Sequence, residues 1–445
     1  MRVTKSSLRG LGSFAFVSLG QFLSQIGSVM ASLGLMFWAY EITGRATELA
    51  MLGFFSLLPP VLFGPLAGAL IDRWPRKRLL IACDLLAGLG SGVVLCLLWR
   101  GALQIWHLYA LSFASALFGT LQGPAFLASA TMMVPKQHYA RASGLMSLSG
   151  NASAVVGPGL AGVLFAVIGL RGLLFVDFAT MLLAVGSLAL VRVPEPERSR
   201  ASASEGVLER LLEDVRAGFS FLRESRPLLS VLSLFAVANV FASVYETLYR
   251  PLVLARTAGD EIAMATTQSL MGIGGIAAAV VVSPFGSPQK KMYAMLGSFA
   301  LGSVFRAVFG INAGYSVMVA SALLSSLLFT YGGSCSNALW QTKVPPELQG
   351  RVFTTRFALA KVLALFTRAL SGPLADRVFE PAMAGGRPLA GALGWLVGVG
   401  KGAGIGLFIS LTSFATFGLL VWGFLRREIR EIDTTAPDHD EAPTA

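Results

Sequence analysis

The sequence has 445 residues, of which 54% are hydrophobic and only 13% are charged. Soluble domains carry about 25% charged residues, so a water-soluble core cannot absorb this much apolar surface. The formal net charge of +11 would suggest nucleic-acid binding in a soluble protein, but the basic residues gather between apolar stretches, which argues against that class of partner.

Twelve apolar stretches run through nearly the whole chain, each long enough for a helix to cross about 30 Å of hydrocarbon. We therefore predict an all-α polytopic membrane protein whose partner is the lipid bilayer. The basic start and the apolar run from Phe14 to Tyr40 are too long for a signal-peptide core, so we expect the first helix to be retained. The predicted spans are 14–40, 47–71, 79–99, 105–129, 141–168, 170–191, 228–252, 262–284, 292–311, 315–340, 352–378 and 402–425.

A charged segment with Pro194 and Pro196 divides the spans six and six. We predict an N-terminal six-helix half over 1–191, a cytoplasmic linker over 192–227 and a C-terminal six-helix half over 228–425. The linker contains a candidate amphipathic helix at 205–223. The acidic, proline-containing tail over 426–445 is expected to be cytoplasmic and disordered.

The two halves share a short repeat. Val134-Pro135 is followed by Arg141 between spans four and five, and Val344-Pro345 is followed by Arg351 between spans ten and eleven, at the same offset. Its recurrence at matched places predicts the duplicated, pseudo-symmetric architecture of secondary transporters.

The basic residues are distributed asymmetrically across the predicted spans. They concentrate in the N-terminal segment, in the loops from even to odd spans and in the C-terminal tail. This positive-inside pattern predicts that both termini are cytoplasmic.

Polar residues recur at intervals of three and four along spans one, four, seven and ten, and span five also qualifies. Exposing such a polar face to lipid costs free energy, so the pattern predicts a central polar cavity for a small-molecule substrate. The alternative is that small polar stripes are helix-packing faces. The substrate-cavity candidates on these spans and on span eleven are Gln21, Gln25, Gln122, Asn239, Asn337, Gln341, Lys361 and Arg368.

Span eleven carries two cations inside the predicted hydrocarbon region. Lys361 lies close to the midplane, and Arg368 follows at i+7 on nearly the same helical face. A charge at the bilayer centre costs about 2.5–3.5 kcal/mol, so both require a partner or a cavity. They form a candidate cradle for an anionic or carbonyl-rich substrate, or they pair with acids on neighbouring helices and fix packing.

Four acidic residues are candidates for proton coupling or for structural pairing. Glu246 lies on a striped helix and is the first proton-coupling candidate, with an intrahelical pair to Arg250 as the alternative. Glu41, near the end of span one, is a weaker candidate. Asp84 and Asp177 lie on spans without a clear stripe, which favours structural roles. No cofactor, metal site or disulfide framework is expected, and the energy source is expected to be a proton gradient.

The segment Gly68-Ala-Leu-Ile-Asp72-Arg73-Trp-Pro75-Arg76 follows span two. It resembles the loop signature of the major facilitator superfamily, G-x-x-x-D-R-x-G-R, with Pro75 in place of the second glycine. The resemblance implies a twelve-helix transporter in which Asp72 sits against the N-terminus of span eleven and stabilises an outward-open state.

Span five carries Gly150 and, further on, Gly157-Pro158-Gly-Leu-Ala161-Gly162. This resembles the GPxxGG signature of antiporters in the same superfamily, from which Ala161 departs. The stretches IDRWPRKRLLIACDLL, NALWQTKVPPELQGRVF and SGPLADRVFEP resemble the drug:proton antiporter subgroup that contains macrolide efflux pumps and the enterobactin exporter.

The resemblance implies a bacterial inner-membrane exporter that uses alternating access and proton antiport. Its expected substrate is amphipathic, such as a macrolide-like drug, a siderophore or a peptide natural product. An importer or a lysophospholipid flippase on the same fold stays open, as does a membrane receptor or scaffold without transport. An enzyme is disfavoured, because neither an H-E-x-x-H nor a G-x-S-x-G pattern occurs. We expect a monomer.

Overall fold

The computed structural model describes residues 5–135, 138–191, 216, 219–223, 225–285 and 290–435. Within these ranges every regular element is helical, and eleven helices are long and apolar enough to cross a membrane. One of the eleven, α5 (Tyr139–Leu190), holds two of the predicted spans. The predicted all-α fold with twelve apolar spans is therefore confirmed.

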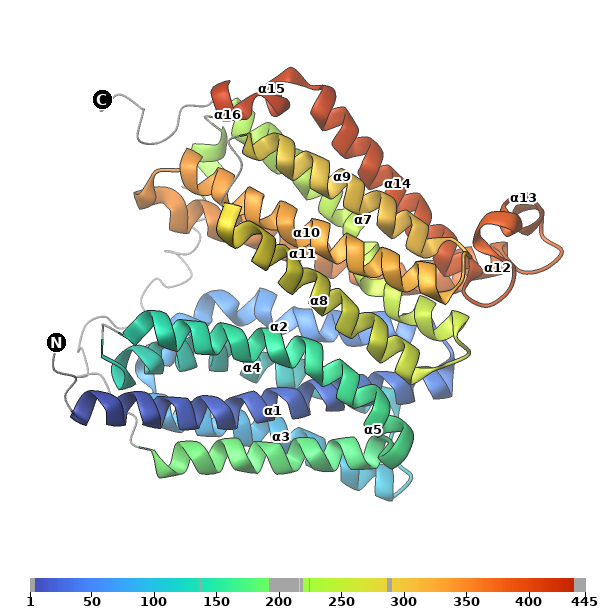
Figure 1. Ribbon diagram of the computed structural model, residues 1–445. Coiled ribbons are helices and arrows are strands. Elements are labelled where there is room, and N and C mark those ends of the chain that lie inside the picture. Colours follow the sequence, from blue (N-terminus) through green and yellow to red (C-terminus); the bar gives the residue numbers. More distant parts are fainter. Residues whose placement is uncertain are drawn as a thin grey trace. The chain divides into compact units, whose positions relative to one another are not determined.

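The elements follow the predicted spans closely along the chain (Figure 1). In the first half they are α1 (Lys5–Thr43), α2 (Ala46–Arg73), α3 (Arg76–Trp99), α4 (Ile105–Met133) and α5. In the second half the long helices are α7 (Arg226–Arg256), α8 (Glu261–Phe285), α9 (Lys291–Gly310), α10 (Tyr315–Lys343), α11 (Pro346–Leu374) and α14 (Ala403–Leu425). Between α11 and α14 lie the π-helical turn η2 (Ala375–Phe379), α12 (Glu380–Ala382) and α13 (Pro388–Val397).

The break inside α5 is made by one residue. Gly169 has φ 61° and ψ −171°, a conformation that glycine adopts without the steric penalty a side chain would bring. The chain reverses there, and Figure 1 shows the second leg of α5 running in the opposite direction to the first, with α1 between the two legs. Gly169 therefore separates the predicted spans five and six.

The described chain falls into two compact units, each taken here by itself. The first comprises residues 1–43, 52–208 and 261–269, and the second comprises residues 44–51, 209–260 and 270–445. The units thus follow the two predicted halves, except that the first turns of α2 group with the second unit and the first turns of α8 group with the first. The predicted linker over 192–227 lies largely outside the described residues.

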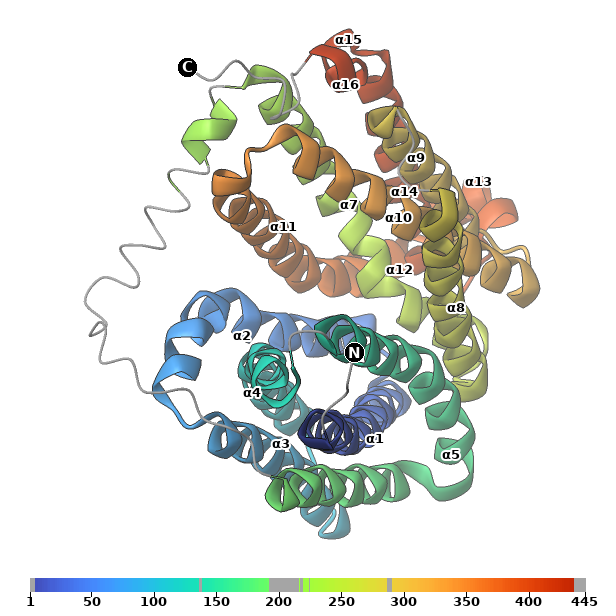
Figure 2. The same cartoon turned by 60° about the vertical axis from the view of Figure 1, so that its left-hand side comes forward.

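In the first unit, α1 packs against α5 and α4, and α3 packs against α4 and α5 (Figure 2). A core of buried apolar side chains joins these helices, including Phe14, Leu80, Ala125 and Leu188. At Gly27 a Cβ atom would lie 3.1 Å from the Cα of Asp177, so a glycine is what lets α1 approach the second leg of α5 this closely.

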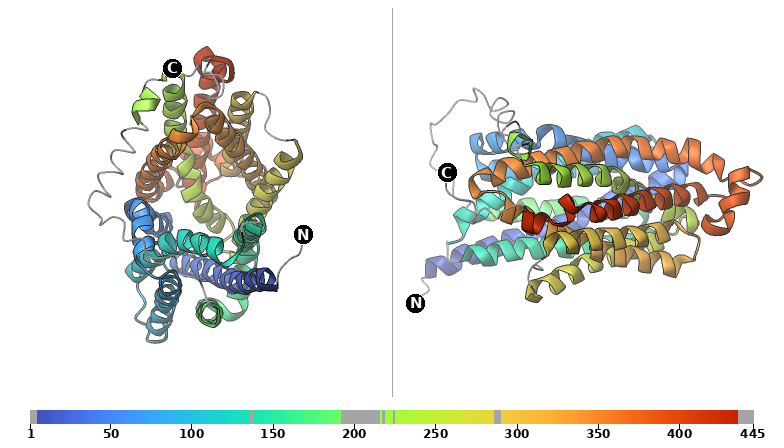
Figure 3. Two further views of the ribbon diagram at one scale, coloured as in Figure 1. Left: turned by 90° about the vertical axis from the view of Figure 1, so that its left-hand side faces the viewer. Right: turned by 90° about the horizontal axis from the view of Figure 1, so that it is seen from above.

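In the second unit, α9 packs against α10 and α14, while α7 packs against α14 and α11 (Figure 3). Its main core contains Val231, Met295, Leu339, Trp340 and Leu420, all buried. The same helix order therefore recurs: the third helix of each half packs on the fourth, and the first and third pack on the sixth.

The beginning of the tail differs from the disordered segment that the sequence predicts. Residues 427–430 and 432–435 form the short helices α15 (Arg427–Arg430) and α16 (Ile432–Thr435). Ile429 and Ile432 are buried, and Asp433 accepts a hydrogen bond of 2.9 Å from the main-chain nitrogen of Met292 at the start of α9. Two buried isoleucines and a helix cap order this stretch. Residues 436–445 lie outside the described residues.

A carboxylate in the second unit holds the start of α2. Asp376, in η2, accepts hydrogen bonds from the main-chain nitrogens of Ala46 (3.0 Å) and Thr47 (2.7 Å) and from the Thr47 hydroxyl. A Cβ at Gly372 would lie 2.6 Å from the Cα of Thr47, so α11 and the first turn of α2 are in direct backbone contact. Asp376 therefore caps α2 and complements its helix dipole.

Candidate functional site

Asp84 lies at the centre of a polar cluster in the first unit. Its side chain, on α3, is only 4% exposed. Gln21 of α1 donates a hydrogen bond of 2.7 Å to Asp84 Oδ2, and Gln122 of α4 donates to Asp84 Oδ1. Gln122 also donates to Gln21 Oε1 at 3.0 Å. Three helices thus meet at one buried carboxyl group whose hydrogen-bond partners are neutral amides.

Asp177 is the second buried carboxyl group of this unit, also 4% exposed. It lies on the second leg of α5 and accepts a hydrogen bond of 3.0 Å from Ser28 of α1 and one from Ser91 of α3. Its donors are therefore neutral hydroxyls.

The two acids share their neighbouring helices at a fixed spacing. Gln21 and Ser28 are seven residues apart on α1, and Asp84 and Ser91 are seven residues apart on α3. Seven residues are two helical turns, or about 10 Å along the axis. The acids therefore lie at two levels between α1 and α3: Asp84 on α3 also accepts from α4, and Asp177 on α5 accepts from both α1 and α3.

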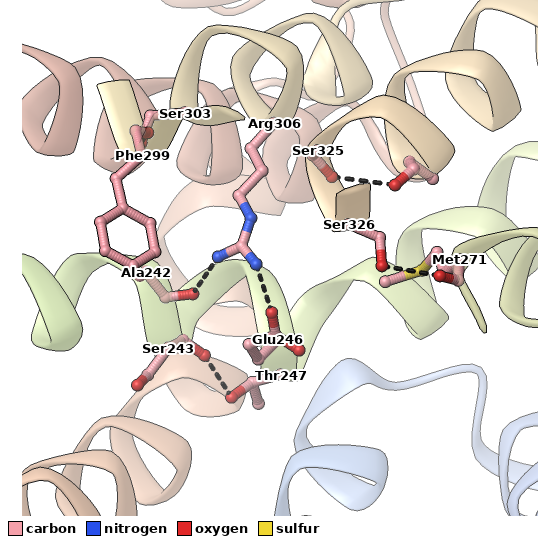
Figure 4. Close-up of polar contacts among 11 residues, drawn as sticks. Ala242, Ser243, Glu246, Thr247, Met271, Phe299, Ser303, Arg306, Ser325 and Ser326 are labelled. Carbon is pink, nitrogen blue, oxygen red and sulfur yellow. Dashed lines mark hydrogen bonds and ion pairs between the residues drawn. The ribbon is translucent and has the colours of Figure 1, made fainter. Parts of the chain in front are cut away.

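The corresponding interface of the second unit contains an ion pair (Figure 4). Arg306 of α9 points toward α7, where Nη2 donates to Glu246 Oε1 and Nη1 donates to the carbonyl oxygen of Ala242 at 3.4 Å. The Arg306 side chain is 6% exposed and that of Glu246 is 44% exposed. The acid that the sequence singled out for proton coupling is thus held by a cation on another helix.

Aromatic rings enclose the Arg306 guanidinium. Its Cζ lies 4.4 Å from the ring centroid of Tyr245 and 3.5 Å from that of Phe329. Cation–π contacts of this kind stabilise a cation that has left water. Arg306 is therefore fixed on several sides.

Further cations lie near Glu246. Arg368, on α11, is half-buried and within electrostatic range of Glu246 and Arg250. Glu246 thus pairs with Arg306 of α9 and lies near Arg368 of α11. Arg250 follows it by about one turn on α7. The region has an excess of positive charge, which suits an anionic or carbonyl-rich ligand group.

The remaining cavity candidates are exposed side chains on the predicted spans. Gln25 accepts a long hydrogen bond from Ser153 of α5, and Asn239 donates one of 3.0 Å to the main chain of its own helix. The other exposed candidates are Asn337, Gln341 and Lys361. An exposed polar side chain inside a spanning helix requires water or polar ligand on that face. Glu41, the weaker proton candidate, is exposed near the end of α1.

Most of the predicted gating motif lies outside the described side chains, namely those of Gly68, Asp72 and Arg73. Arg76 is described: its Nη1 donates a hydrogen bond of 2.7 Å to the carbonyl oxygen of Ala128 on α4. This contact ties the start of α3 to α4.

The glycines of the antiporter-like motif differ in their surroundings. At Gly162 a Cβ would lie 2.5 Å from the Cβ of Ala265 on α8, and at Gly157 it would lie 2.7 Å from Val29 on α1. At Gly150 nothing lies within 4 Å. Pro158 lies inside the helix. Two of the three glycines therefore allow close helix contacts.

Asp84 and Asp177 are the residues whose site character the sequence did not reveal. The signal was present in the matched heptad spacing of Gln21 with Ser28 and of Asp84 with Ser91. Reading it required the knowledge that α1 and α3 face each other.

Comparison with known proteins gives a family. The family model of the Major Facilitator Superfamily matches residues 17–358. Macrolide efflux protein A of Streptococcus pyogenes is 23% identical over 370 residues, which cover 82% of this chain and 90% of that protein. Multidrug efflux pump Tap of Mycolicibacterium fortuitum is 24% identical, covering 75% of this chain and 82% of that protein. Enterobactin exporter EntS of Citrobacter koseri is 25% identical, covering 64% and 66%.

Solved structures share the fold. The nucleoside transporter NupG matches with a TM-score of 0.69 at 11% identity, covering 93% of this chain and all of that one (100%). A bacterial homologue of the iron transporter ferroportin matches with a TM-score of 0.61 at 15% identity, covering 94% and 99%. At such low identities the likeness concerns the fold alone.

Proposed function

This chain belongs to the Major Facilitator Superfamily, and we propose that it exports an amphipathic small molecule across a bacterial inner membrane by proton antiport. Its likeness to efflux proteins over 82% of its length is the observation that carries the direction of transport. Alternating access of two six-helix halves is the mechanism that the duplicated helix order supports.

Proton coupling is supported by the acids inside the spans. Glu246 on α7 and the buried Asp84 and Asp177 are carboxyl groups at membrane depth, where ionisable residues are costly and commonly functional. The close contact at Gly162, in the antiporter-like motif, adds support because it brings the first turns of α8 against α5. The energy source would be the proton gradient, with no cofactor.

The substrate is proposed to be a macrolide-like drug, a siderophore or a peptide natural product. The excess of positive charge around Glu246, with the exposed Lys361 further along α11, suits carbonyl, carboxylate or catecholate oxygens. The polar side chains of α1, α4, α7 and α10 would contact the rest of the molecule. The basic loops favour cytoplasmic termini, and we expect the transporter to act as a monomer.

Transport in proteoliposomes tests this function. The purified protein is reconstituted and an inside-acidic pH gradient is imposed. Accumulation of radiolabelled erythromycin and of an iron-free catecholate siderophore in the vesicles is then measured. We expect gradient-dependent accumulation of at least one probe in the vesicle population whose orientation mimics export. Accumulation only in the opposite orientation would indicate an importer, and movement of a fluorescent lysophospholipid instead would indicate a flippase. No flux and no ligand-induced thermal stabilisation would favour a receptor or scaffold.

The substrate role of Lys361 has its own test. Lys361→Met removes the charge but keeps the length of the side chain, and we expect a roughly tenfold weaker apparent affinity for the transported probe, equivalent to about 1.4 kcal/mol. The matched control is Lys290→Met, at the exposed N-cap of α9, which should transport normally. Unchanged affinity in Lys361→Met would assign this lysine to structure.

A further inference from the structure

We propose that Asp84 binds the coupled proton and that Asp177 is a second, separate proton-binding group of the same unit. The inference rests on the proposed antiport and deepens it, because it moves the coupling site from Glu246 to the interface of α1 and α3.

The Asp84 cluster can satisfy both states of the carboxyl group. When Asp84 is ionised, its two oxygens accept hydrogen bonds from Gln21 and Gln122, as the structure shows. When it is protonated, its hydroxyl needs an acceptor, and the Gln21 amide supplies its oxygen by turning over. This exchanges the hydrogen bond that Gln21 Oε1 accepts from Gln122 for one from the carboxyl group. The Gln122 amide that loses this acceptor is only half-buried, so the carboxyl group itself has a partner in both states.

The same exchange works at Asp177. Ser28 and Ser91 donate to the ionised carboxylate, and a hydroxyl group can rotate to accept a hydrogen bond from the protonated form. Both acids are thus surrounded by groups that reverse their donor and acceptor roles without a change in charge.

Glu246 lacks this property. Its partner Arg306 keeps its proton under all ordinary conditions, so protonating Glu246 would leave a guanidinium that is 6% exposed without its counter-ion. The carbonyl of Ala242 and the two rings would remain as partners. In the part of the chain that the structure describes, Glu246 therefore has no neutral partner that could exchange donor and acceptor roles with it, as the partners of Asp84 and Asp177 can.

No cation faces Asp84 among the described side chains of the helices packed around it. Arg76 and Lys77, at the start of α3, donate to main-chain carbonyl oxygens of α4 and α5. The described titratable or charged side chains on these helices, apart from the two acids, are Tyr40 and Glu41 on α1, Arg76, Lys77, Arg78, Cys83 and Cys96 on α3, His107 and Tyr109 on α4, and Tyr139, Arg141 and Arg171 on α5. Of these, Cys83 lies beside Asp84 and interacts with it electrostatically.

Each buried acid has one partner that reaches the surface of the unit. Gln122 is half-buried, and Ser28 is exposed. Gln122 and Ser28 therefore offer a proton a route from the surface of the unit to Asp84 and to Asp177, which are themselves buried. At two helical turns apart, about 10 Å, the acids do not share a proton, so each is a site of its own.

The direct test is carboxyl protonation measured without substrate. Infrared difference spectra of the full-length protein in lipid are recorded between acidic and alkaline pH, and the carbonyl-stretch band of protonated carboxyl groups is followed. We expect Asp84→Asn to remove one component of this band and Asp177→Asn another, while Glu246→Gln leaves the titrating band unchanged. Loss of the band in Glu246→Gln alone would overturn the proposal.

A second variant keeps the test decisive if Asp84→Asn fails to fold. Gln122→Met has a similar shape but removes a donor to ionised Asp84, so the band's midpoint should move to higher pH, whereas Asn239→Met, on α7, should not move it. An unmoved midpoint in Gln122→Met would contradict the assignment.

Flux measurements separate this inference from the proposed antiport. With erythromycin as the probe, Asp84→Asn should lose at least tenfold of gradient-driven accumulation and keep exchange of labelled for unlabelled erythromycin. Wild-type-like accumulation in Asp84→Asn would overturn the inference while leaving antiport intact. If the wild type ignores the gradient, the proposed antiport fails, and a titrating Asp84 band would still support proton binding there.

Discussion

The first and third helices of each half are linked through carboxyl groups, but by opposite chemistry. Between α1 and α3 the acids are Asp84 and Asp177, and their partners are neutral amides and hydroxyls. Between α7 and α9 the acid is Glu246 and its partner is a guanidinium. A neutral donor lets the acid gain or lose a proton, whereas an arginine opposes its neutralisation.

This difference suggests separate roles for the two halves, proton binding in the first and ligand binding in the second. The first unit holds two buried acids with neutral partners, whereas in the second unit Glu246 pairs with Arg306 and lies near Arg368. Coupling groups and ligand-holding charges would then lie on different halves. In alternating access, both protonation of the first half and ligand binding to the second would shift the equilibrium between the inward-facing and outward-facing states. Each event would therefore change the affinity for the other.

The ion pair supplies the largest expected effect on stability. Arg306→Met removes the cation, its two cation–π contacts and its hydrogen bond to α7, leaving Glu246 without a partner on α9. Breaking a buried pair costs 3–5 kcal/mol, but Glu246 is 44% exposed, so solvent screening lowers the expected loss to about 2 kcal/mol. Unfolding in mixed detergent micelles with increasing dodecyl sulfate measures it.

The matched change in the first unit is Gln21→Met. It removes one neutral partner and leaves Asp84 bonded to Gln122, so the loss should be about 1 kcal/mol. The loss should be smaller at acidic pH, because a hydrogen bond to a neutral carboxyl group is weaker than one to a carboxylate. A loss equal to that of Arg306→Met, independent of pH, would break the comparison between the two links.

The next effect concerns the glycines of the antiporter-like motif. Gly162→Ala would place a Cβ 2.5 Å from the Cβ of Ala265 and 3.0 Å from the carbonyl oxygen of Glu261. Overpacking of this kind costs about 1–3 kcal/mol. We expect a lower unfolding midpoint and slower transport.

The chain offers its own control within the motif. At Gly150 nothing lies within 4 Å of the added Cβ, so Gly150→Ala should match the wild type in stability or exceed it slightly, since alanine favours the helix. Equal losses at Gly150 and Gly162 would mean that the motif acts through helix flexibility rather than through contact with α8.

The fold was predictable because its main signals are local. Apolar runs long enough to span the membrane predict where the helices lie. Residues 141–191 form one continuous apolar run, but the predicted boundary between spans five and six coincides with Gly169, which has a positive φ in the structure. The tail was less predictable, since Ile429 and Ile432 are ordered by packing against a distant core. Composition alone does not report such contacts.

The candidate site was predictable only in part, because its chemistry depends on which helices face each other. The polar stripes identified Gln21 and Gln122, which the structure joins in one cluster. The same reasoning left out Asp84, since span three has no stripe of its own. It also favoured Arg250 as the alternative partner of Glu246, whereas the ion pair shown in Figure 4 is made with Arg306, 60 residues away in sequence.

The last predicted effect concerns the cap on α2. Asp376→Asn keeps one oxygen for the main-chain nitrogens of Ala46 and Thr47 but removes the negative charge at the helix N-terminus. Losing the charge should lower the free energy of unfolding by about 1 kcal/mol. This value lies between the typical contribution of a helix-dipole interaction and that of a hydrogen bond to a charged group. The unfolding midpoint measures it, with Asp376→Ala expected to lose more. Stability of Asp376→Asn equal to that of the wild type would contradict a charge-assisted cap on α2.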